Sequence, residues 1–360
     1  MGRFLALLAA AIVPSLPSHD TVAAHQAEYR QFAEAGLVQM QDRWWNANKG
    51  WYDNRYPEDG QVASVWSSYP MMELVAAVAI ADPTEDNIAL VNSTFKAGEG
   101  FWDPTINGTG GIAWQWGLSP SGNAYFDDAG WWGIAYLDAY RATSNKRWLW
   151  DAGRVLAYID HYGWDAKNGG MWWDTGVNYK TSEPLAAATQ IAATLYRIQH
   201  KKYYLDLATK YLAWADAKTM NHGLYGRSAT DGTVMDYVEG MMIDAHVQLC
   251  LATKNQSYCN QAESIAKASL DQFPVLHPWT PEPDTIYYKA ILDLYAVDHD
   301  PTWYALAYAN AEEAKDNARD ETGWWSKDWW GDWADPGVLF TPAATLEMFA
   351  WMAATPPPGS

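Results

Sequence analysis

Cysteine and histidine are scarce in this sequence, and neither occurs with the spacing of a metal or redox motif. Among 360 residues, two are cysteine and eight are histidine. No two histidines stand four positions apart, as they would in a helical metal site, and the two cysteines do not form a Cys-x-x-Cys pair. We therefore expect no metal chemistry and no cofactor. The sequence leaves open whether loop carboxylates hold a structural cation.

Positive charge is also in short supply. The chain has 24 Lys and Arg against 43 Asp and Glu, which gives a formal net charge of −19. Nucleic acids and anionic membranes repel such a protein, so a neutral or cationic partner is expected. No Pro/Ser-rich linker or charge block divides the chain. We expect one domain over residues 23–354 and a polar tail over 355–360 without a lipid-anchor signal, in a monomer.

A continuous apolar run occurs at the N-terminus, where Arg3 precedes the stretch Phe4–Val13. The run is too short to cross a bilayer and is typical of a secretory signal peptide. We predict a signal peptide over residues 1–22, cleaved between 15 and 24, and a secreted, extracellular protein; a buried terminal helix is the alternative. In that setting Cys250 and Cys259 would form a disulfide. The Asn-x-Ser/Thr sequons would carry glycans at Asn92, Asn107 and Asn255.

Alternating strand patterns are rare, and helical periodicity dominates. The predicted helices span approximately residues 23–41, 66–81, 84–97, 126–143, 145–161, 183–199, 201–217, 233–252, 257–271, 283–297, 301–318 and 341–353. Loops rich in glycine and aromatic residues follow every second helix, at 49–53, 110–116, 169–174, 222–226, 277–279 and 323–331. This repeat predicts an all-α fold, an (α/α)6 barrel of six helical hairpins. The helices that begin near 66, 126, 183, 233, 283 and 341 would form its inner layer. An open superhelical solenoid is the alternative.

Tryptophan and tyrosine are unusually frequent. The sequence has 23 Trp and 22 Tyr but 8 Phe. Because Trp and Tyr combine an apolar ring with a polar group, they favour half-solvated clefts over dry cores. A tryptophan-rich core remains the alternative for about half of them.

The segment Phe126-Asp127-Asp128-Ala129-Gly130-Trp131-Trp132 places two adjacent carboxylates at a predicted helix start. Two carboxyl groups, one acting as acid and one as nucleophile or base, are what glycosidic bond cleavage requires. The helix N-terminus would stabilise one as a carboxylate, and like charge beside indoles would keep the other protonated. From these residues alone, a helix cap is the slightly better explanation. Adjacent helical side chains diverge by about 100°, so only one of Trp131 and Trp132 can face a cleft.

The stretch from Asn123 to Thr143, with sequence NAYFDDAGWWGIAYLDAYRAT, resembles the signature of glycoside hydrolase family 76, the α-1,6-mannanase family. Further matches are GGMWWD at 169–174, Tyr179-Lys180, and Tyr237 with Gly240. The resemblance covers most of the chain and implies a six-hairpin α/α barrel. It also implies endo-cleavage of α-1,6-mannosidic bonds in cell-wall mannan by double displacement with retention. Asp127 would be the nucleophile and Asp128 the general acid/base.

The sequence departs from the family pattern at two places. Thr181-Ser182-Glu183 follows Tyr179-Lys180, and Val238-Glu239 follows Tyr237, where the mannanases carry amide side chains. Linkage and chain-length preference are therefore left open. The candidate substrate-binding residues, taken from the aromatic loops and the inner helix starts, are Trp114, Trp116, Trp131, Trp132, Trp172, Trp173, Asp174, Tyr179, Lys180, Glu183, Tyr237, Glu239, Trp324 and Trp325.

The leading hypothesis is a secreted retaining endo-α-1,6-mannanase with a polysaccharide substrate. Three alternatives remain at this stage. The protein would be a mannan transglycosidase of the cell wall, a catalytically inactive mannan-binding protein, or an inverting α/α-barrel glycosidase.

Overall fold

The computed structural model describes residues 13–117, 123–273 and 279–359, and twelve α-helices form its framework. Their bounds are α1 His19–Trp44, α2 Val65–Ala81, α3 Glu85–Gly98, α4 Phe126–Thr143, α5 Lys146–Tyr158, α6 Ser182–Gln199, α7 Lys202–Lys218, α8 Asp236–Thr253, α9 Gln256–Gln272, α10 Pro281–Asp298, α11 Pro301–Asn317 and α12 Phe340–Ala354. Every predicted helix is present, with its ends shifted by about one turn or less. Part of the predicted aromatic loop 277–279 lies outside the described residues.

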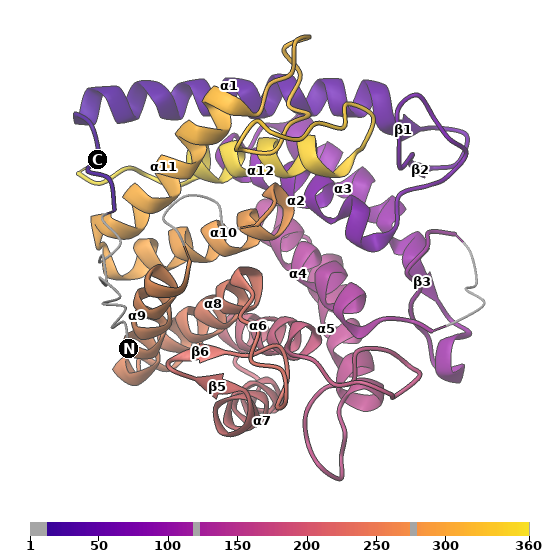
Figure 1. Cartoon of the computed structure of the whole chain (residues 1–360). Helices are drawn as coiled ribbons and strands as arrows, with labels where there is room; N and C mark the ends of the chain where they lie inside the picture. Colours follow the sequence, from indigo (N-terminus) through magenta and orange to yellow (C-terminus); the bar gives the residue numbers. More distant parts are fainter. Residues whose placement is uncertain (1–12, 118–122, 274–278, 360) are drawn as a thin grey trace, which may run out of the picture.

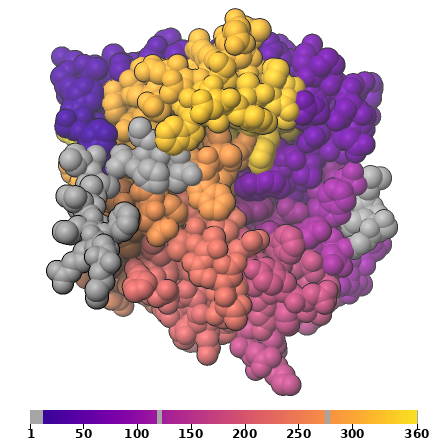
Figure 2. Space-filling model, in the orientation of Figure 1, coloured from indigo at the N-terminus to yellow at the C-terminus, as the bar shows by residue number. Residues whose placement is uncertain are grey.

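Six helices form a closed inner ring. Each of α2, α4, α6, α8 and α10 packs against the next even-numbered helix, and α12 packs against both α10 and α2. The odd-numbered helices cover this ring from outside (Figure 1). In Figure 2 the colours of the sequence follow one another around the face of the molecule, from indigo through magenta and orange to yellow. The fold is therefore the predicted (α/α)6 barrel, and the contact between α12 and α2 excludes an open solenoid.

Burial separates the two layers as the sequence pattern predicted. In α6, every residue from Ser182 to Leu195 is buried. In the neighbouring outer helix α7, buried residues are confined to one stripe, at Leu207, Ala208, Tyr211, Leu212 and Ala215. A helix that is buried on all sides must have apolar or small residues all round, whereas an outer helix needs them on one face.

Two glycines allow neighbouring inner helices to approach closely. A Cβ atom on Gly130 of α4 would lie 2.4 Å from Cβ of Ala187 in α6. A Cβ atom on Gly240 of α8 would lie 2.8 Å from Cα of Tyr287 and 3.1 Å from the carbonyl oxygen of Ile286 in α10. The second approach is to backbone, which cannot rotate away, so Gly240 sets the spacing of α8 and α10.

The inner and outer helices of four hairpins are joined by two-residue turns. These turns begin with a left-handed residue, Ser144, His200, Lys254 or His299, at φ between 53° and 59°. The connections at the other end are longer and include the short antiparallel pairs β1 Trp45–Asn46 with β2 Trp51–Tyr52, β3 Trp102–Asp103 with β4 Gly111–Ile112, and β5 Met220–Asn221 with β6 Leu224–Tyr225. One rim of the barrel is thus tightly turned, and the other carries the large loops.

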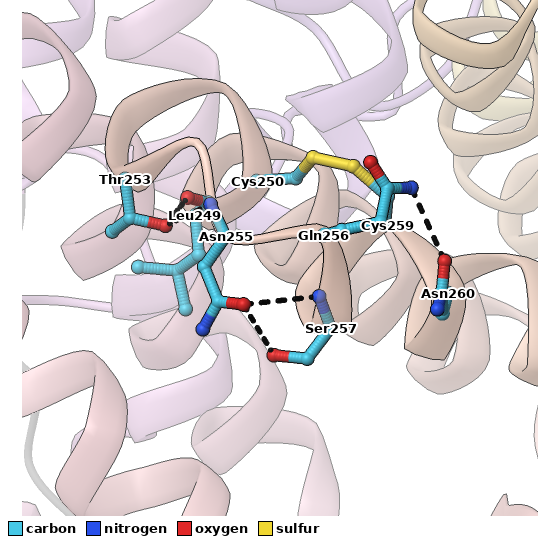
Figure 3. Close-up of a disulfide and its surroundings, with 8 residues drawn as sticks. All are labelled: Leu249, Cys250, Thr253, Asn255, Gln256, Ser257, Cys259 and Asn260. Atoms are coloured by element: carbon cyan, nitrogen blue, oxygen red, sulfur yellow. Dashed lines mark hydrogen bonds between the residues drawn. A yellow bond between two sulfur atoms is a disulfide. The ribbon is translucent and has the colours of Figure 1, made fainter.

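The predicted disulfide joins Cys250 in the last turn of α8 to Cys259 in α9, across one of the two-residue turns (Figure 3). Their Cα atoms are 5.3 Å apart, within the usual range for disulfides. The side chain of Asn255 lies in the same turn, where its Oδ1 accepts hydrogen bonds from the amide and hydroxyl of Ser257. The disulfide therefore links α8 to α9 next to Asn255, the N-cap residue of α9.

The three sequons differ in their surroundings. Asn107 and Asn255 are exposed. Asn92 is half-buried in α3; its Nδ2 donates to the Ile88 carbonyl, and its Oδ1 accepts from Asn145 and from the Trp148 indole. Asn92 is thus less accessible than the other two sequons, and glycosylation at Asn92, Asn107 and Asn255 remains a prediction.

The two ends of the described chain lie side by side in the barrel. Helix α1 packs along α12, and Nε2 of Gln26 donates to the Thr355 carbonyl at 2.7 Å (Figure 1). Helix α1 begins at His19, inside the predicted cleavage region, and residues 1–12 of the predicted signal peptide lie outside the described residues. No described helix combines the length and apolarity needed to span a membrane.

Candidate active site

A cleft of about 540 Å³ opens at the large-loop rim, and all six inner helices contribute their first residues to it. Loops supply the remaining side chains. The lining residues are Trp66, Tyr125, Asp127, Asp128, Trp131, Trp173, Glu183, Arg227, Tyr237, Trp279, Thr280, Pro283 and Phe340. Six predicted site residues are brought together here: Asp127, Asp128, Trp131, Trp173, Glu183 and Tyr237.

Asp127 and Asp128 lie half-buried in the first turn of α4, in different surroundings. Asp127 accepts hydrogen bonds from the Trp173 indole at 2.7 Å and from the Asp128 amide at 2.9 Å. Burial raises the pKa of Asp127 to about 6, and these two hydrogen bonds limit the rise. Burial and the adjacent Asp127 charge raise the pKa of Asp128 well above its usual value. Asp127 is therefore the group that ionises first, while Asp128 retains its proton.

A loop anchors the start of α4 in this position. The amide of Phe126 donates to the Trp173 carbonyl at 2.8 Å, and Tyr125 forms a backbone bridge with Asp174. The rings of Tyr125 and Trp173 also pack at 5.2 Å. Because backbone and indole of Trp173 both reach α4, the loop sets the orientation of the carboxyl pair.

Aromatic rings form one wall of the cleft. Trp131 packs against Trp66 at 5.3 Å and against Tyr237 at 5.9 Å, and Trp66 packs against Phe340 at 5.2 Å. The four rings come from four inner helices, α4, α2, α8 and α12. Continuous aromatic surface beside carboxyl groups suits the C–H face of a pyranose ring.

Glu183 and Arg227 form an ion pair at the cleft edge, with Arg227 Nε 3.3 Å from Glu183 Oε1. Burial and the charge of Asp127 raise the pKa of Glu183 to about 7, against the opposing effect of Arg227. Thr181 donates its hydroxyl to the other oxygen of Glu183. Among the lining residues that the structure describes, Arg227 is the one cation.

A second hollow of about 420 Å³ adjoins the first across the Glu183–Arg227 pair. Ser182 and Ser228, which neighbour that pair in sequence, line it together with Trp172, Tyr179, Lys180 and Trp214. Lys180 donates to Asp165 at 2.6 Å and lies 4.6 Å from the centre of the Trp172 ring. Three predicted substrate-binding residues, Trp172, Tyr179 and Lys180, therefore line this side hollow and not the cleft itself.

Four predicted substrate contacts are corrected because the structure buries them. Trp132 stacks on Tyr136 at 3.8 Å and donates to the Gly98 carbonyl, facing the outer layer. Trp324 stacks on Trp44, and Trp325 packs on Phe32 and Phe349; both are 4% exposed. Glu239 is fully buried and accepts a hydrogen bond from the Tyr225 amide. Each of these four side chains packs or forms hydrogen bonds inside the protein and does not face the cleft.

Three further predicted residues lie outside both hollows. Trp116 stacks on Trp51 and donates to the Ala97 carbonyl. Trp114 is exposed near the start of α2, where its carbonyl accepts from the Val65 amide. Asp174 accepts from the Gly176 amide and stabilises its own loop. Their role as sugar contacts is not supported by these positions.

Sequence reasoning missed Trp66, Tyr125, Arg227, Trp279 and Phe340, which also line the cleft. Trp66 and Phe340 occupy first-turn positions of inner helices. The predicted barrel already implied that the first turns of inner helices face the rim. Trp66 and Phe340 could therefore have been predicted as cleft residues from the sequence. Trp279 belongs to the predicted aromatic loop 277–279, so a signal for it was present as well. Arg227 stands on a loop, and periodicity gives no information about it.

Comparisons with known proteins agree with this architecture. The sequence profile of glycosyl hydrolase family 76 matches residues 89–355. None of the curated proteins matches the sequence.

Several solved structures have the same fold at low sequence identity. A family 76 α-mannanase of Bacteroides thetaiotaomicron is 21% identical, with a TM-score of 0.79 over 91% of this chain and 95% of that one. An inactive α-1,6-mannanase of Salegentibacter, with two consecutive aspartates replaced by asparagine and α-1,6-mannotriose bound, is 19% identical, with a TM-score of 0.72 over 90% and 99% of the chains.

A cellobiose 2-epimerase of Spirochaeta thermophila is 12% identical, with a TM-score of 0.72 over 93% of this chain and 98% of that one. The barrel therefore serves more than one reaction, and the family assignment rests on the sequence profile. Because that profile spans most of the chain, from α3 to the end of α12, the protein belongs to glycosyl hydrolase family 76 and is a glycoside hydrolase.

Proposed function

We propose that this protein is a secreted, retaining endo-α-1,6-mannanase that cleaves cell-wall mannan. The observation that carries the proposal is the unequal environment of Asp127 and Asp128 in an aromatic cleft. The Salegentibacter enzyme, an α-1,6-mannanase, is inactive when two consecutive aspartates are replaced, which supports the same role for this adjacent pair.

In the proposed first step, the Asp127 carboxylate attacks the anomeric carbon while Asp128 donates its proton to the departing glycosidic oxygen. The bond from carbon to that oxygen breaks as the bond to Asp127 forms, giving a glycosyl ester. In the second step, Asp128, now a carboxylate, takes a proton from water, and the hydroxide equivalent displaces Asp127. Two inversions give net retention. The Trp173 hydrogen bond suits Asp127 to the nucleophile's role because it stabilises the carboxylate.

The side hollow beyond Glu183 and Arg227 supports cleavage within a chain over release of terminal sugars. A glycan that leaves the cleft past this ion pair would continue over Trp172 and Tyr179. Secretion is proposed from the N-terminal apolar segment and is consistent with the Cys250–Cys259 disulfide.

The decisive experiment incubates the protein with α-1,6-, α-1,2- and α-1,3-linked mannans and analyses the products over time. We expect oligosaccharides of mixed length from the α-1,6 polymer first. NMR of the earliest product should show the α-anomer before mutarotation. Release of single mannose units alone, or an initial β-anomer, would contradict endo-action or retention.

Two matched variants test the carboxyl pair. Asp127→Asn and Asp128→Asn preserve size and should each lower kcat by several orders of magnitude. Oligosaccharide binding, measured by tryptophan fluorescence, should persist in both. Turnover near that of the wild type in either variant would overturn the assignment. Products longer than the substrate in the presence of acceptor sugar would indicate transglycosylation.

A further inference from the structure

The barrel has a second cavity of about 360 Å³ at the rim opposite the active site. Its walls come from the C-terminal halves of α4, α6, α8 and α10, whereas the cleft is built from the helix starts. Asp138 in this cavity follows Asp127 by eleven positions in α4, which corresponds to about 16 Å along the helix. The volume falls at the lower end of the range typical of small-molecule pockets, roughly 300–1,000 Å³.

The charges that line this cavity balance one another. Lys289 lies 3.3 Å from Asp138 and 3.4 Å from Asp293, and Arg141 lies 3.5 Å from Asp293. Asp244 and Arg197 complete three acidic and three basic side chains. Lys289 and Arg141 each lie beside a carboxylate, Asp244 faces two amides, and the six charges sum to zero. The cavity therefore suits a ligand without net charge.

Two glutamines bring hydrogen-bonding capacity that the protein does not use. Gln190 and Gln248 each donate Nε2 to Asp244, at 2.8 Å and 2.6 Å. Because Asp244 is a carboxylate acceptor, these bonds fix which end of each amide faces it. Both amide oxygens, and Nε of Arg197, are buried without a partner among the described residues. Both glutamines are 7% exposed, and a buried polar atom without a partner is costly.

Apolar side chains complete the wall, chiefly Ile134, Leu137 and Ile198. Arg141 and Asp293 are partly exposed at this rim, which gives access from solvent. Planar amide, carboxylate and guanidinium groups beside an apolar face match a molecule that has hydroxyl groups along its edge and C–H bonds on its face. We propose that this cavity is a second, non-catalytic binding site for a neutral hexose-sized polyol.

The carboxylates that line this cavity are engaged by other groups. Lys289 lies beside Asp138 and Asp293, and Asp244 accepts hydrogen bonds from two amides. We therefore assign binding, and no bond cleavage, to this cavity.

Isoleucine methyl groups provide a local probe. Ile134 and Ile198 line the cavity, whereas the active-site cleft has no isoleucine among its described lining residues. The full protein, labelled with ¹³C at isoleucine δ1 methyls, is titrated with D-mannose, D-glucose, myo-inositol or mannose 6-phosphate. We expect saturable shifts of the Ile134 and Ile198 methyl signals with at least one neutral compound, and none with the phosphate at the same concentrations. Two methyl signals that stay fixed with all neutral compounds, or that move only with the phosphate, would overturn the proposal.

Two variants localise the effect. Gln190→Leu keeps the volume and removes the free amide oxygen, so the apparent affinity should fall about tenfold, as for one lost hydrogen bond. Ile198→Trp fills the cavity from a half-buried wall position and should abolish the shift of the Ile134 signal. It serves as the test if Gln190→Leu does not fold. Full retention of the shift in the folded Ile198→Trp protein would refute the site, and mannan hydrolysis should be unchanged in it.

Discussion

The indole nitrogen of Trp173 lies 2.7 Å from Oδ2 of Asp127 and donates a hydrogen bond to it. A loop residue 46 positions away therefore contributes to the ionisation of the residue that we propose as the nucleophile. The bond stabilises the carboxylate form, so it lowers the pKa of Asp127 against the larger effect of burial.

Replacing Trp173 with Phe should move the acidic limb of the pH–rate profile to higher pH. Without the indole donor, the pKa of Asp127 rises above about 6, and less of the carboxylate is ionised at any acidic pH. A hydrogen bond to a charged group of about 1.5–3 kcal/mol corresponds to roughly one to two pH units. Measurement of kcat/KM against pH provides the readout, and Trp172→Phe, which alters the side hollow, is the control. An unchanged limb would show that Trp173 does not set this pKa.

The wild-type profile itself should be bell-shaped. Activity needs Asp127 ionised, so it should rise as pH increases through about 6. It also needs Asp128 protonated, so it should fall as pH increases through the pKa of Asp128, which burial and Asp127 raise well above the usual value. The two limbs report macroscopic constants of the coupled pair. A profile that is flat between pH 4 and 9 would rule out this assignment of roles.

Gly240→Ala should destabilise the barrel. The new methyl would lie 2.8 Å from Cα of Tyr287, and because the obstacle is backbone, α8 and α10 would have to separate. Overpacking of this kind costs about 1–3 kcal/mol of unfolding free energy. Urea denaturation measures it, with Gly232→Ala as the matched control, since that position has no atom within 4 Å. Equal stability of the two variants would mean that helix spacing does not depend on Gly240.

Two tryptophans should separate a core role from a substrate role. Trp325→Ala should lower the unfolding free energy by about 3–5 kcal/mol with KM unchanged, because the ring packs on Phe32 and Phe349. Trp279 lines the cleft and is 43% exposed, so Trp279→Ala should raise KM with little change in stability. The two measurements are thermal melting and initial rates on mannan. The reverse pattern would restore Trp325 as a substrate contact.

Removal of the disulfide should lower stability without changing catalysis. Cys250 and Cys259 are nine residues apart, and closure of a loop this short contributes about 2–3 kcal/mol through the unfolded state. The Cys250→Ser, Cys259→Ser double variant should show this loss in urea denaturation. Its kcat should match the wild type, because the bridge lies at the rim away from the cleft. A loss of kcat in the folded variant would contradict that separation.

The barrel was predictable because its signals are local and repeated. Helical periodicity and aromatic loops after every second helix together defined six hairpins. The same reasoning placed Asp127 at a rim-facing helix start. It could not separate Trp131 from Trp132, because only the direction of each ring decides which faces the cleft.

The errors have a common physical origin. Trp324, Trp325 and Glu239 are residue types that are common in sugar-binding sites, but packing in the folded protein buries their side chains in the interior. Arg227 was missed because a lone arginine on a loop has no periodicity and no motif. Its importance becomes visible only when the fold brings it to Glu183, 44 positions earlier in the sequence.

The contact between α1 and α12 has a topological consequence. The inner ring is closed by the packing of α12 on α2, and the two ends of the described chain meet at α1 and α12 through the hydrogen bonds of Gln26, without a peptide bond. The order of neighbours around the barrel therefore does not depend on where the backbone is open. A circularly permuted chain, with a short linker from α12 to α1 and new ends between Lys254 and Asn255, would keep every helix beside its present neighbours. In that chain α8 and α9 would be the terminal helices, and the Cys250–Cys259 disulfide would be the covalent link between them.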